Sequence, residues 1–275
     1  MSRHLLRLGG AGTLLVLLTG CSEQWARFGF PEPITDRAPY IENLWVGAWI
    51  ASLVIGVFVW GLIGWAVFRY RRKAGDPEAP RQTKYHLPLE VLYTLVPFLI
   101  IGVLFFYTVR AQDAVLAKTE NPDHVINVIG QKWSWTFNYM EADNAAIGQV
   151  AHTVGTVERT PTLYLPVNKT VRFNLSSPDV IHSFWVPQFL FKLDVIPGHP
   201  NSFDVTPTKE GVFDGKCAEL CGTWHAAMLF KVEVLPEDQY NQKIRDLIAS
   251  GQAGEITTPA NNPNTLPTAS PKGEK

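Results

Sequence analysis

Residues 217–228 read CAELCGTWHAAM, and this stretch carries the strongest signal in the C-terminal half of the chain. Cys217, Cys221, His225 and Met228 follow one another at intervals of four, four and three residues. Thiolate, imidazole and thioether groups are soft or borderline ligands that together favour copper. His182, in the run VIHSFW, lies 35 residues upstream of Cys217. A distant histidine on a strand edge and a ligand loop between the last two strands are typical of copper-binding β-sandwiches, so the sequence predicts this fold.

The same residues also permit simpler interpretations. Cys217 and Cys221 could form a local disulfide in an oxidising compartment, Met228 could be a core residue, and His182 could be a structural histidine. The histidine at +4 and the methionine at +7 favour a metal site over a disulfide, and the second cysteine allows two thiolates to bridge two metals. The other histidines have no comparable setting and are given no role: His4, His86, His124, His152 and His199.

Strand signals surround the ligand stretch. Trp133, Trp135, Phe137 and Tyr139 alternate with polar residues, as in a half-buried strand. Pro and Gly separate further strand candidates, which are Thr162–Pro166, Thr170–Leu175, Val180–Val186, Ser202–Thr206 and Met228–Leu235. The polar stretch 141–160 is expected to be a loop, either in contact with another subunit or without a partner. We therefore expect a β domain over 111–235, a C-terminal helix over 236–250 and a disordered, Pro-, Thr- and Asn-rich tail over 251–275.

Two uncharged apolar runs precede the β domain. Leu44–Phe68 and Val91–Val109 are each long enough to span a hydrocarbon core of about 30 Å. They predict a transmembrane hairpin over 44–110, with helices at about 44–68 and 89–109. The loop 69–87 holds six basic and two acidic residues, so we expect it in the cytoplasm and the segments 21–43 and 111–275 outside.

The charge distribution excludes one class of partner. A formal net charge of -1 gives no support to nucleic-acid binding, which needs a basic excess to neutralise phosphates. Residues 111–250 contain 11 basic and 16 acidic residues. The β domain could thus offer an acidic face to a basic partner, or simply a solvated surface.

The N-terminus has the features of a secretory signal. Arg3 and Arg7 precede a short apolar run, and residues 18–21 read LTGC. This ending resembles the bacterial lipobox, so we expect a lipoprotein signal peptide over 1–20 and a lipid on Cys21; an ordinary signal sequence with a chance cysteine is the alternative. With Cys21 lipidated and the other two cysteines on metal, the chain of three cysteines would have no disulfide.

Over about residues 40–250 the chain closely resembles bacterial cytochrome c oxidase subunit II, of the haem-copper oxidase family. The resemblance is carried by CAELCGTWHAAM, by SPDVIHSF at 177–184 and by LDVIPG at 193–198. It implies a two-helix transmembrane hairpin plus an all-β, cupredoxin-like Greek-key sandwich, in the bacterial plasma membrane as a multi-pass protein, with the sandwich on the extracytoplasmic side.

The resemblance also implies the ligands of a dinuclear copper centre, CuA. Cys217 and Cys221 would bridge the two coppers, and His182 and His225 would each bind one. Met228 and the backbone carbonyl of Glu219 would be weak axial ligands. The Glu219 side chain would help subunit I to bind Mg or Mn, whereas haem and CuB would lie in subunit I.

The implied function is electron transfer, with no catalytic residue for bond-making on this chain. Electrons would come from a cytochrome c, either free or linked to a bc complex, at Trp133 in QKWSW, and pass to haem in subunit I for O2 reduction coupled to proton pumping. Trp133 could equally be a packed strand aromatic. Glu90, at the cytoplasmic start of the second helix, would lie near the mouth of a proton channel, or be an interfacial glutamate. Subunit III, membrane lipid, a copper chaperone and a thiol reductant are further expected partners.

Three other functions fit parts of the sequence. A membrane-anchored copper chaperone of the Sco type also uses C-x3-C and a distant histidine, but has one anchor helix, a thioredoxin-like βαβ pattern and a downstream histidine. A quinol oxidase subunit II, or a purely structural cupredoxin-like subunit, would lack the copper ligands, all of which are present here.

Overall fold

The computed structural model describes residues 23–79 and 82–257. The chain divides into two compact units, one formed by Asn43–Asp113 and the other by the described residues on both sides of that segment. The expected signal peptide and Cys21 lie outside the described residues.

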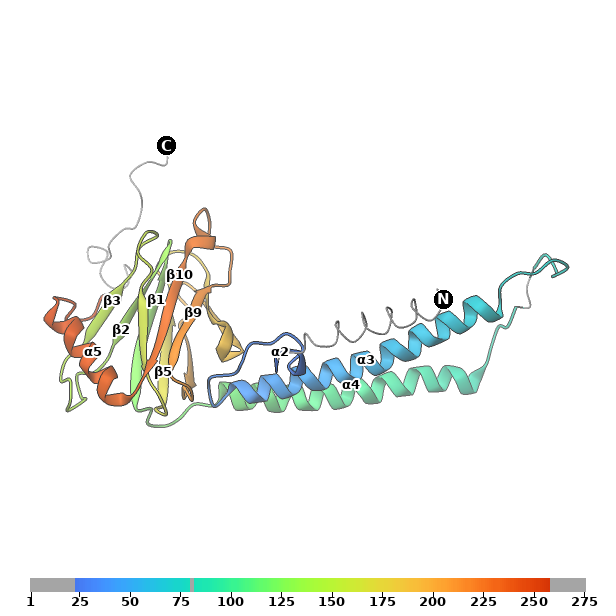
Figure 1. The fold of residues 1–275 in the computed structure, drawn as a ribbon, viewed down its shortest axis with the longest axis horizontal. Helices are drawn as coiled ribbons and strands as arrows, with labels where there is room; N and C mark the ends of the chain where they lie inside the picture. Colours follow the sequence, from blue (N-terminus) through green and yellow to red (C-terminus); the bar gives the residue numbers. More distant parts are fainter. Residues whose placement is uncertain (1–22, 80–81, 258–275) are drawn as a thin grey trace, which may run out of the picture. The chain divides into compact units, whose positions relative to one another are not determined.

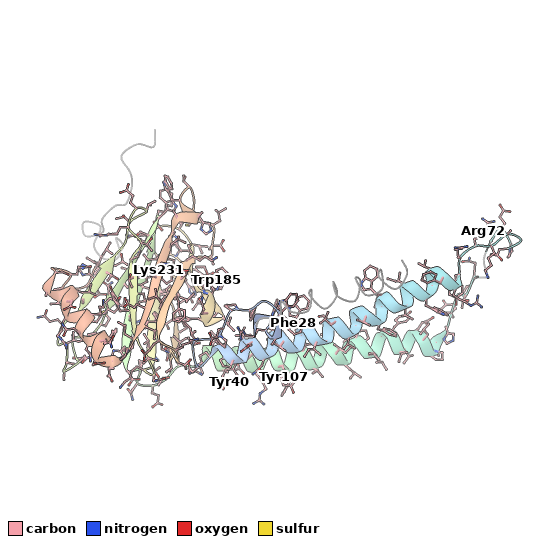
Figure 2. The ribbon with its side chains drawn as sticks, viewed as in Figure 1. Phe28, Tyr40, Arg72, Tyr107, Trp185 and Lys231 are labelled. Atoms are coloured by element: carbon pink, nitrogen blue, oxygen red, sulfur yellow. The ribbon has the colours of Figure 1, made fainter. Side chains whose placement is uncertain are left out.

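Two long helices form the first unit. After the short α2 (Glu23–Ala26), α3 covers Ala38–Arg69 and α4 covers Leu87–Leu116. Side chains project outward along both helices (Figure 2), and no residue in the most apolar window of either helix is buried. A helix is the form in which a segment satisfies its own backbone hydrogen bonds in lipid, so exposed apolar helices of this length fit a membrane.

Both helices are longer than the apolar runs predict. In α3 the helix begins at Ala38, whose N–H donates to the Thr35 hydroxyl at 3.2 Å, so a polar cap rather than hydrophobicity sets this end. In α4 the helix continues past Arg110 through AQDAVL, a mixed segment in which alanine, glutamine and leucine are good helix formers. Helix ends are thus set by capping and propensity, which an apolar run does not register.

The second unit is a sandwich of two five-stranded sheets (Figure 1). The first sheet has the order β3-β2-β1-β5-β8, with β1 at His124–Gln131, β2 at Ser134–Tyr139, β3 at Ala151–Val154, β5 at Val171–Ser176 and β8 at Asn201–Val205. The second has the order β4-β10-β9-β6-β7, with β4 at Thr162–Pro166, β6 at His182–Val186, β7 at Phe191–Val195, β9 at Gly211–Cys217 and β10 at Leu229–Leu235. The short helix α5 covers Glu237–Ala249. The predicted all-β architecture is confirmed.

Aromatic side chains from both sheets fill the space between them. Trp135 and Phe137 of β2 each meet Phe230 of β10 with ring centroids 5.4 Å apart, and Phe184 of β6 stacks on Phe230 at 4.9 Å. All four rings are buried. Offset and edge-on contacts of this kind stabilise a core beyond the burial of area, and this core directly underlies the strands that carry the candidate ligands.

The alternation over 133–139 predicts a half-buried strand, but β2 is buried on both faces. Its aromatic face packs into the core, whereas its polar face is covered by the C-terminal segment after α5. Asn138 donates its side-chain amide to the Ile256 carbonyl at 2.8 Å and accepts the Ile256 N–H at 2.9 Å, and Ala253 pairs with the edge of β3. The expectation of a disordered tail is therefore wrong for residues 251–257, whose backbone is held by side chains distant in sequence; residues 258–275 lie outside the described residues.

The polar stretch 141–160 is not simply a loop, because it contains β3 and a buried carboxylate. Glu141 accepts hydrogen bonds from Tyr240 of α5 at 2.7 Å and from Asn144 at 2.8 Å, and lies 2.8 Å from His124 Nδ1. Burial by itself would raise the pKa of Glu141, but these hydrogen bonds hold it below its ordinary value. His124, which the sequence leaves without a role, thus helps to fix α5 on the sandwich.

Both covalent connections to the helices are fastened near β8. On the N-terminal side, Asp36 and Thr206 exchange hydrogen bonds at 3.0 and 2.8 Å. On the C-terminal side, the Thr119 N–H donates to the buried carboxylate of Asp204 at 2.7 Å. Arg172 of β5 donates to the same carboxylate from Nε and Nη2, each at 2.8 Å. The sandwich therefore holds the two segments that lead to the helices.

Adding a methyl group at Gly215 is expected to destabilise the sandwich by about 1–3 kcal/mol, as overpacking of a core does. A Cβ at this position of β9 would lie 2.1 Å from Cε2 of Phe230, and that ring is confined by Phe184 and Trp135. Thermal unfolding of the full chain in detergent measures the effect of Gly215→Ala. The exposed neighbour Asp214→Ala is the control, and an unchanged midpoint for Gly215→Ala would show that the ring has room to move.

Candidate metal centre

The candidate ligands come from the loop between β9 and β10 and from the start of β6. Cys217 ends β9, and its N–H donates to the Met228 carbonyl at 3.0 Å, which closes the loop at its base. The next N–H, of Ala218, donates to the Ser183 carbonyl at 3.0 Å and joins the loop to β6 beside His182. Backbone hydrogen bonds to two strands thus fix the positions of side chains that lie far apart in sequence.

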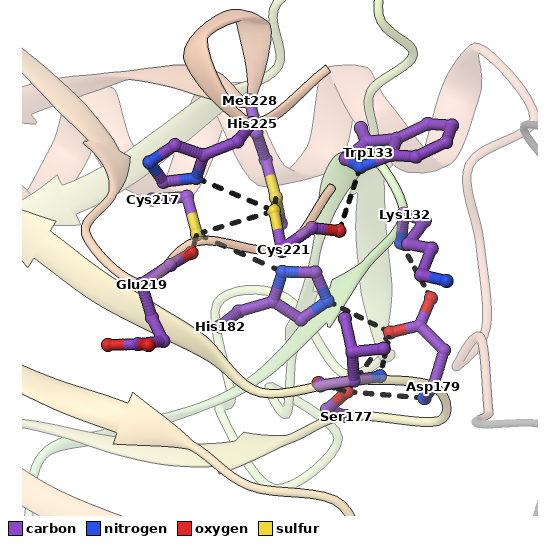
Figure 3. Close-up of polar contacts among 11 residues, drawn as sticks. Lys132, Trp133, Ser177, Asp179, His182, Cys217, Glu219, Cys221, His225 and Met228 are labelled. Atoms are coloured by element: carbon purple, nitrogen blue, oxygen red, sulfur yellow. Dashed lines mark hydrogen bonds and ion pairs between the residues drawn. The ribbon is translucent and has the colours of Figure 1, made fainter. Parts of the chain in front are cut away.

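The structure brings all the predicted donor groups together (Figure 3). The Cys217 and Cys221 sulfurs are free thiols 3.9 Å apart, well beyond the roughly 2.05 Å of a disulfide bond. His182 Nδ1 lies 3.8 Å from the Cys217 sulfur, and His225 Nδ1 lies 3.6 Å from the Cys221 sulfur. The Met228 sulfur is 3.8 Å from the Cys221 sulfur, and the Glu219 carbonyl oxygen is 3.2 Å from the Cys217 sulfur.

This donor set fits a soft metal ion. His182, Cys217 and Cys221 are all buried, and their ligand atoms lie within 4.8 Å of one another. Two thiols, two imidazole nitrogens and a thioether are the ligands that copper prefers, whereas Mg or Ca prefers oxygen. Each thiol has its own histidine, so the arrangement offers two similar halves around a pair of sulfurs.

The two thiols differ in acidity. Burial by itself would raise the pKa of Cys217, but the hydrogen bond with His182 and the nearby backbone lower it to about 7. Burial raises the pKa of Cys221, and the negative charge that develops on Cys217 raises it further. Cys217 is therefore the first thiol to lose its proton. A cation between the two sulfurs would favour deprotonation of Cys221, because it would offset the negative charge on Cys217.

Trp133 contacts the ligand loop from β2's side, and Glu219 lies within this loop. The Trp133 indole N–H donates to the Cys221 carbonyl at 3.0 Å, and the ring is only 8 % exposed. The ring also packs on Gly222, where a Cβ would lie 3.2 Å from it. Glu219 turns its carbonyl toward Cys217 while its side chain is exposed.

Glu90 has a structural role at the start of α4. Its Oε1 accepts the His86 N–H at 3.0 Å, and His86 Nδ1 accepts the Leu89 N–H at 3.3 Å. The two side chains thus satisfy backbone donors that a helix N-terminus leaves free. This contact favours the interfacial interpretation of Glu90, and a place at a proton channel stays a prediction.

One charged residue beside the candidate ligands, Asp179, is not predicted from the sequence to be a site residue. Asp179 lies in SPDVIHSF, and its Oδ1 is 2.9 Å from Nε2 of His182. The signal that could have found it is a carboxylate three residues before a candidate histidine ligand, because such histidines commonly donate their second N–H to a carboxylate.

Comparisons with known proteins identify the family of the chain. Residues 124–235 match the family model for the periplasmic domain of cytochrome c oxidase subunit II. The probable cytochrome c oxidase subunit 2 of Streptomyces avermitilis is 45% identical over 93% of this chain and 90% of its own length. Cytochrome c oxidase subunit 2 of Mycobacterium tuberculosis is 35% identical over 98% of this chain and 88% of its own length.

A solved structure is similar as well. It is the crystal structure of the periplasmic domain of cytochrome oxidase subunit II of Bradyrhizobium japonicum, which is 27% identical to this chain. The match covers 48% of this chain and 99% of that one, with a TM-score of 0.42. With the family model and with relatives at 35–45% identity along nearly the whole sequence, the comparisons show that the chain belongs to the cytochrome c oxidase subunit II family.

Proposed function

We propose that this chain is the electron-accepting subunit of a proton-translocating cytochrome c oxidase. It would take electrons from a cytochrome c and deliver them to haem in subunit I, where O2 is reduced. Family membership implies a copper centre, and the observation that carries the proposal is the pair of buried, free thiols flanked by two imidazoles. When bound, a dinuclear copper centre (CuA) would supply a one-electron relay.

The residues that would hold this centre are Cys217 and Cys221 as shared thiolates and His182 and His225 as one imidazole for each copper. Met228 and the Glu219 carbonyl would be the weak ligands. All of them lie at strand ends or in the loop between β9 and β10, which backbone hydrogen bonds close. Ligands held by a rigid scaffold move little between redox states, and a buried site excludes water, so both properties favour rapid electron transfer.

The other assignments extend the same proposal. The Glu219 side chain is exposed, which suits a Mg or Mn site completed by subunit I. Two helices long enough to span a bilayer and the basic loop 69–87 support a multi-pass protein of the bacterial plasma membrane with the sandwich outside. Subunits I and III, lipid on Cys21 and a free or bc-linked cytochrome c complete the proposed partners. A Sco-type chaperone is disfavoured, because the described residues form a β-sandwich rather than a βαβ unit.

Copper loading of the full chain in detergent tests the proposal. We expect two copper ions per chain, a purple colour and a seven-line electron-spin signal, because one unpaired electron shared by two coppers couples to both nuclei. A colourless chain that binds a single Cu(I) would contradict the dinuclear assignment. Mixing the copper-loaded chain with reduced cytochrome c then tests whether electrons pass from the cytochrome to the copper centre.

Copper affinity is expected to rise with pH, because thiols bind metal only after losing their protons. The pKa of Cys217 is lowered to about 7 and that of Cys221 is raised. Burial by itself would lower the pKa of His182, but its hydrogen bonds with Asp179 and Cys217 raise it, so at acidic pH binding releases an imidazole proton as well as both thiol protons. Well above pH 7 the Cys221 proton remains, and because each released proton changes affinity about tenfold per pH unit, affinity should rise more steeply with pH below 7 than above it. Competition with a chelator between pH 6 and 9 measures the two slopes, and a flat profile would contradict them.

Replacing Trp133 with phenylalanine is expected to slow electron acceptance while leaving copper in place. Phenylalanine keeps a ring on Gly222 but removes the N–H that donates to the Cys221 carbonyl. We expect kcat/KM with reduced cytochrome c to fall roughly tenfold or more, about 1.4 kcal/mol in the barrier, with an unchanged copper signal. Trp185→Phe on the outer face of β6 (Figure 2) is the control. Equal rates for both variants would leave Trp133 as a packing residue.

A further inference from the structure

Asp179 lies in the turn between β5 and β6 and uses both carboxylate oxygens (Figure 3). Its Oδ1 is 2.9 Å from Nε2 of His182, and its Oδ2 accepts the Lys132 N–H at 2.7 Å. The Val180 N–H, at 2.6 Å, and the Ser177 hydroxyl, at 3.3 Å, also donate to Oδ1. The side chain is 29% exposed. The carboxylate is therefore held mainly by protein donors, which come from the β1–β2 turn, from the β5–β6 turn and from His182.

The first contact selects the form of the His182 ring. A carboxylate only accepts hydrogen bonds, so Nε2 of His182 must carry the hydrogen. In the neutral ring the unprotonated nitrogen is then Nδ1, which is the atom that faces the Cys217 sulfur at 3.8 Å. The ring is fully buried, and in the described residues Asp179 is the acidic group that reaches it. Asp179 thus presents the lone pair of His182 to the metal site.

The second contact joins the metal site to the segment that contains Trp133. Asp179 holds the N–H of Lys132, the next residue is Trp133, and the Trp133 indole donates to the carbonyl of Cys221. A closed circuit of contacts therefore runs from Cys217 through His182, Asp179 and residues 132–133 to Cys221. Displacement of this one carboxylate would release both a ligand and the indole segment.

In the part of the chain that the structure describes, no lysine or arginine forms an ion pair with Asp179. Among the described residues its ion-pair partner within 4.0 Å is His182, and the other donors are the backbone N–H groups of Lys132 and Val180 and the Ser177 hydroxyl. A negative charge next to a ligand favours the more positive state of a bound metal. Its loss should therefore raise the reduction potential of the centre.

We propose that Asp179 is a positioning residue for electron acceptance: its two oxygens fix the metal-binding tautomer of His182 and the Lys132–Trp133 backbone at the same time. This inference rests on the proposed function, because it concerns the same copper centre. It assigns a role to a residue that would not itself bind the metal.

The test compares Asp179→Asn, Asp179→Glu and wild type as full chains in detergent. Asparagine has nearly the same shape but only one acceptor oxygen, so either His182 or Lys132 must face an NH2 group. We expect Asp179→Asn to bind copper 10- to 100-fold more weakly in competition with a chelator, as loss of an outer-shell partner typically does, and to have a raised reduction potential. Asp179→Glu, which keeps two acceptors, should recover most of the affinity.

The control is Asp214→Asn, which removes the same charge from an exposed position of β9. It should leave affinity and potential unchanged. Wild-type affinity and potential in Asp179→Asn, or equal changes in Asp214→Asn, would overturn the role of Asp179. Failure of the wild-type chain to bind two coppers would instead overturn the proposed function, so the two failures are distinguishable.

Discussion

Replacing Cys217 with serine is expected to abolish the dinuclear copper signal and to lower electron transfer from cytochrome c by at least about 100-fold, about 2.7 kcal/mol in the barrier. The Cys217 sulfur lies within 3.9 Å of the Cys221 sulfur, of His182 Nδ1 and of the Glu219 carbonyl oxygen, so it is at the centre of the donor set. A serine hydroxyl stays protonated at neutral pH and is a hard ligand, whereas copper would be held here by soft thiolates.

Copper stoichiometry, the electron-spin spectrum and the rate of reduction by cytochrome c measure this effect in the full chain. Cys21→Ser is the matched control, because it removes the chain's third cysteine from a segment far from the ligand loop in sequence. Retention of two coppers and of the seven-line signal in Cys217→Ser would exclude the thiolate pair as the bridge. Loss of the signal in Cys21→Ser as well would point to assembly rather than ligation.

Replacing Arg172 with methionine is expected to destabilise the sandwich by about 3 kcal/mol, because it leaves a buried carboxylate without its cation. The Asp204 side chain is fully buried, and Arg172 donates to both of its oxygens at 2.8 Å. Burial by itself would raise the pKa of Asp204, but Arg172 and the Thr119 N–H hold it below its ordinary value. The lower limit of the usual 3–5 kcal/mol range applies because Arg172 is 23% exposed and partly solvated.

The sign of the pH dependence follows from the lowered pKa of Asp204. In the wild type the ion pair stabilises the fold above the unfolded pKa of about 3.9 and loses this contribution as the pH falls through the lower, folded pKa. In Arg172→Met the carboxylate costs stability at neutral pH, so the difference between the two chains should shrink on acidification. Denaturant unfolding of the full chain in detergent at pH 7 and pH 4 measures both effects.

Lys231→Met is the control for Arg172→Met. Lys231 pairs with Asp214 on the outer face of the second sheet, where both side chains are largely exposed, and exposed pairs contribute little. Equal losses of stability in the two variants would show that burial of Asp204 is not the cause. Arg172→Met should also loosen Thr119, because the Thr119 N–H donates a hydrogen bond to Asp204. Thr119 lies in the segment that leads from α4 into β1.

Local properties of the sequence determine the candidate ligands and the two helices that are long and apolar enough to span a membrane. Copper chemistry depends on residue type and spacing, so CAELCGTWHAAM and the upstream His182 predict the donor groups that the fold brings together. A bilayer-spanning helix depends on the length of an apolar run, so Leu44–Phe68 and Val91–Val109 lie within α3 and α4. The close resemblance of these motifs to one family is confirmed by relatives along nearly the whole chain.

Which polar groups meet depends on how the sheets and their connections pack. Glu141 and Tyr240 are 99 residues apart, Asn138 and Ile256 are 118 apart, and Lys132 and Asp179 are 47 apart. A polar side chain in a strand or loop has the same local signature whether it is solvated or buried, because its partner is chosen by the packing of the sheets. The pairing of the segment after α5 with β2 and β3 and the place of Asp179 beside His182 could therefore not be predicted from the sequence, although the residues that would bind copper could.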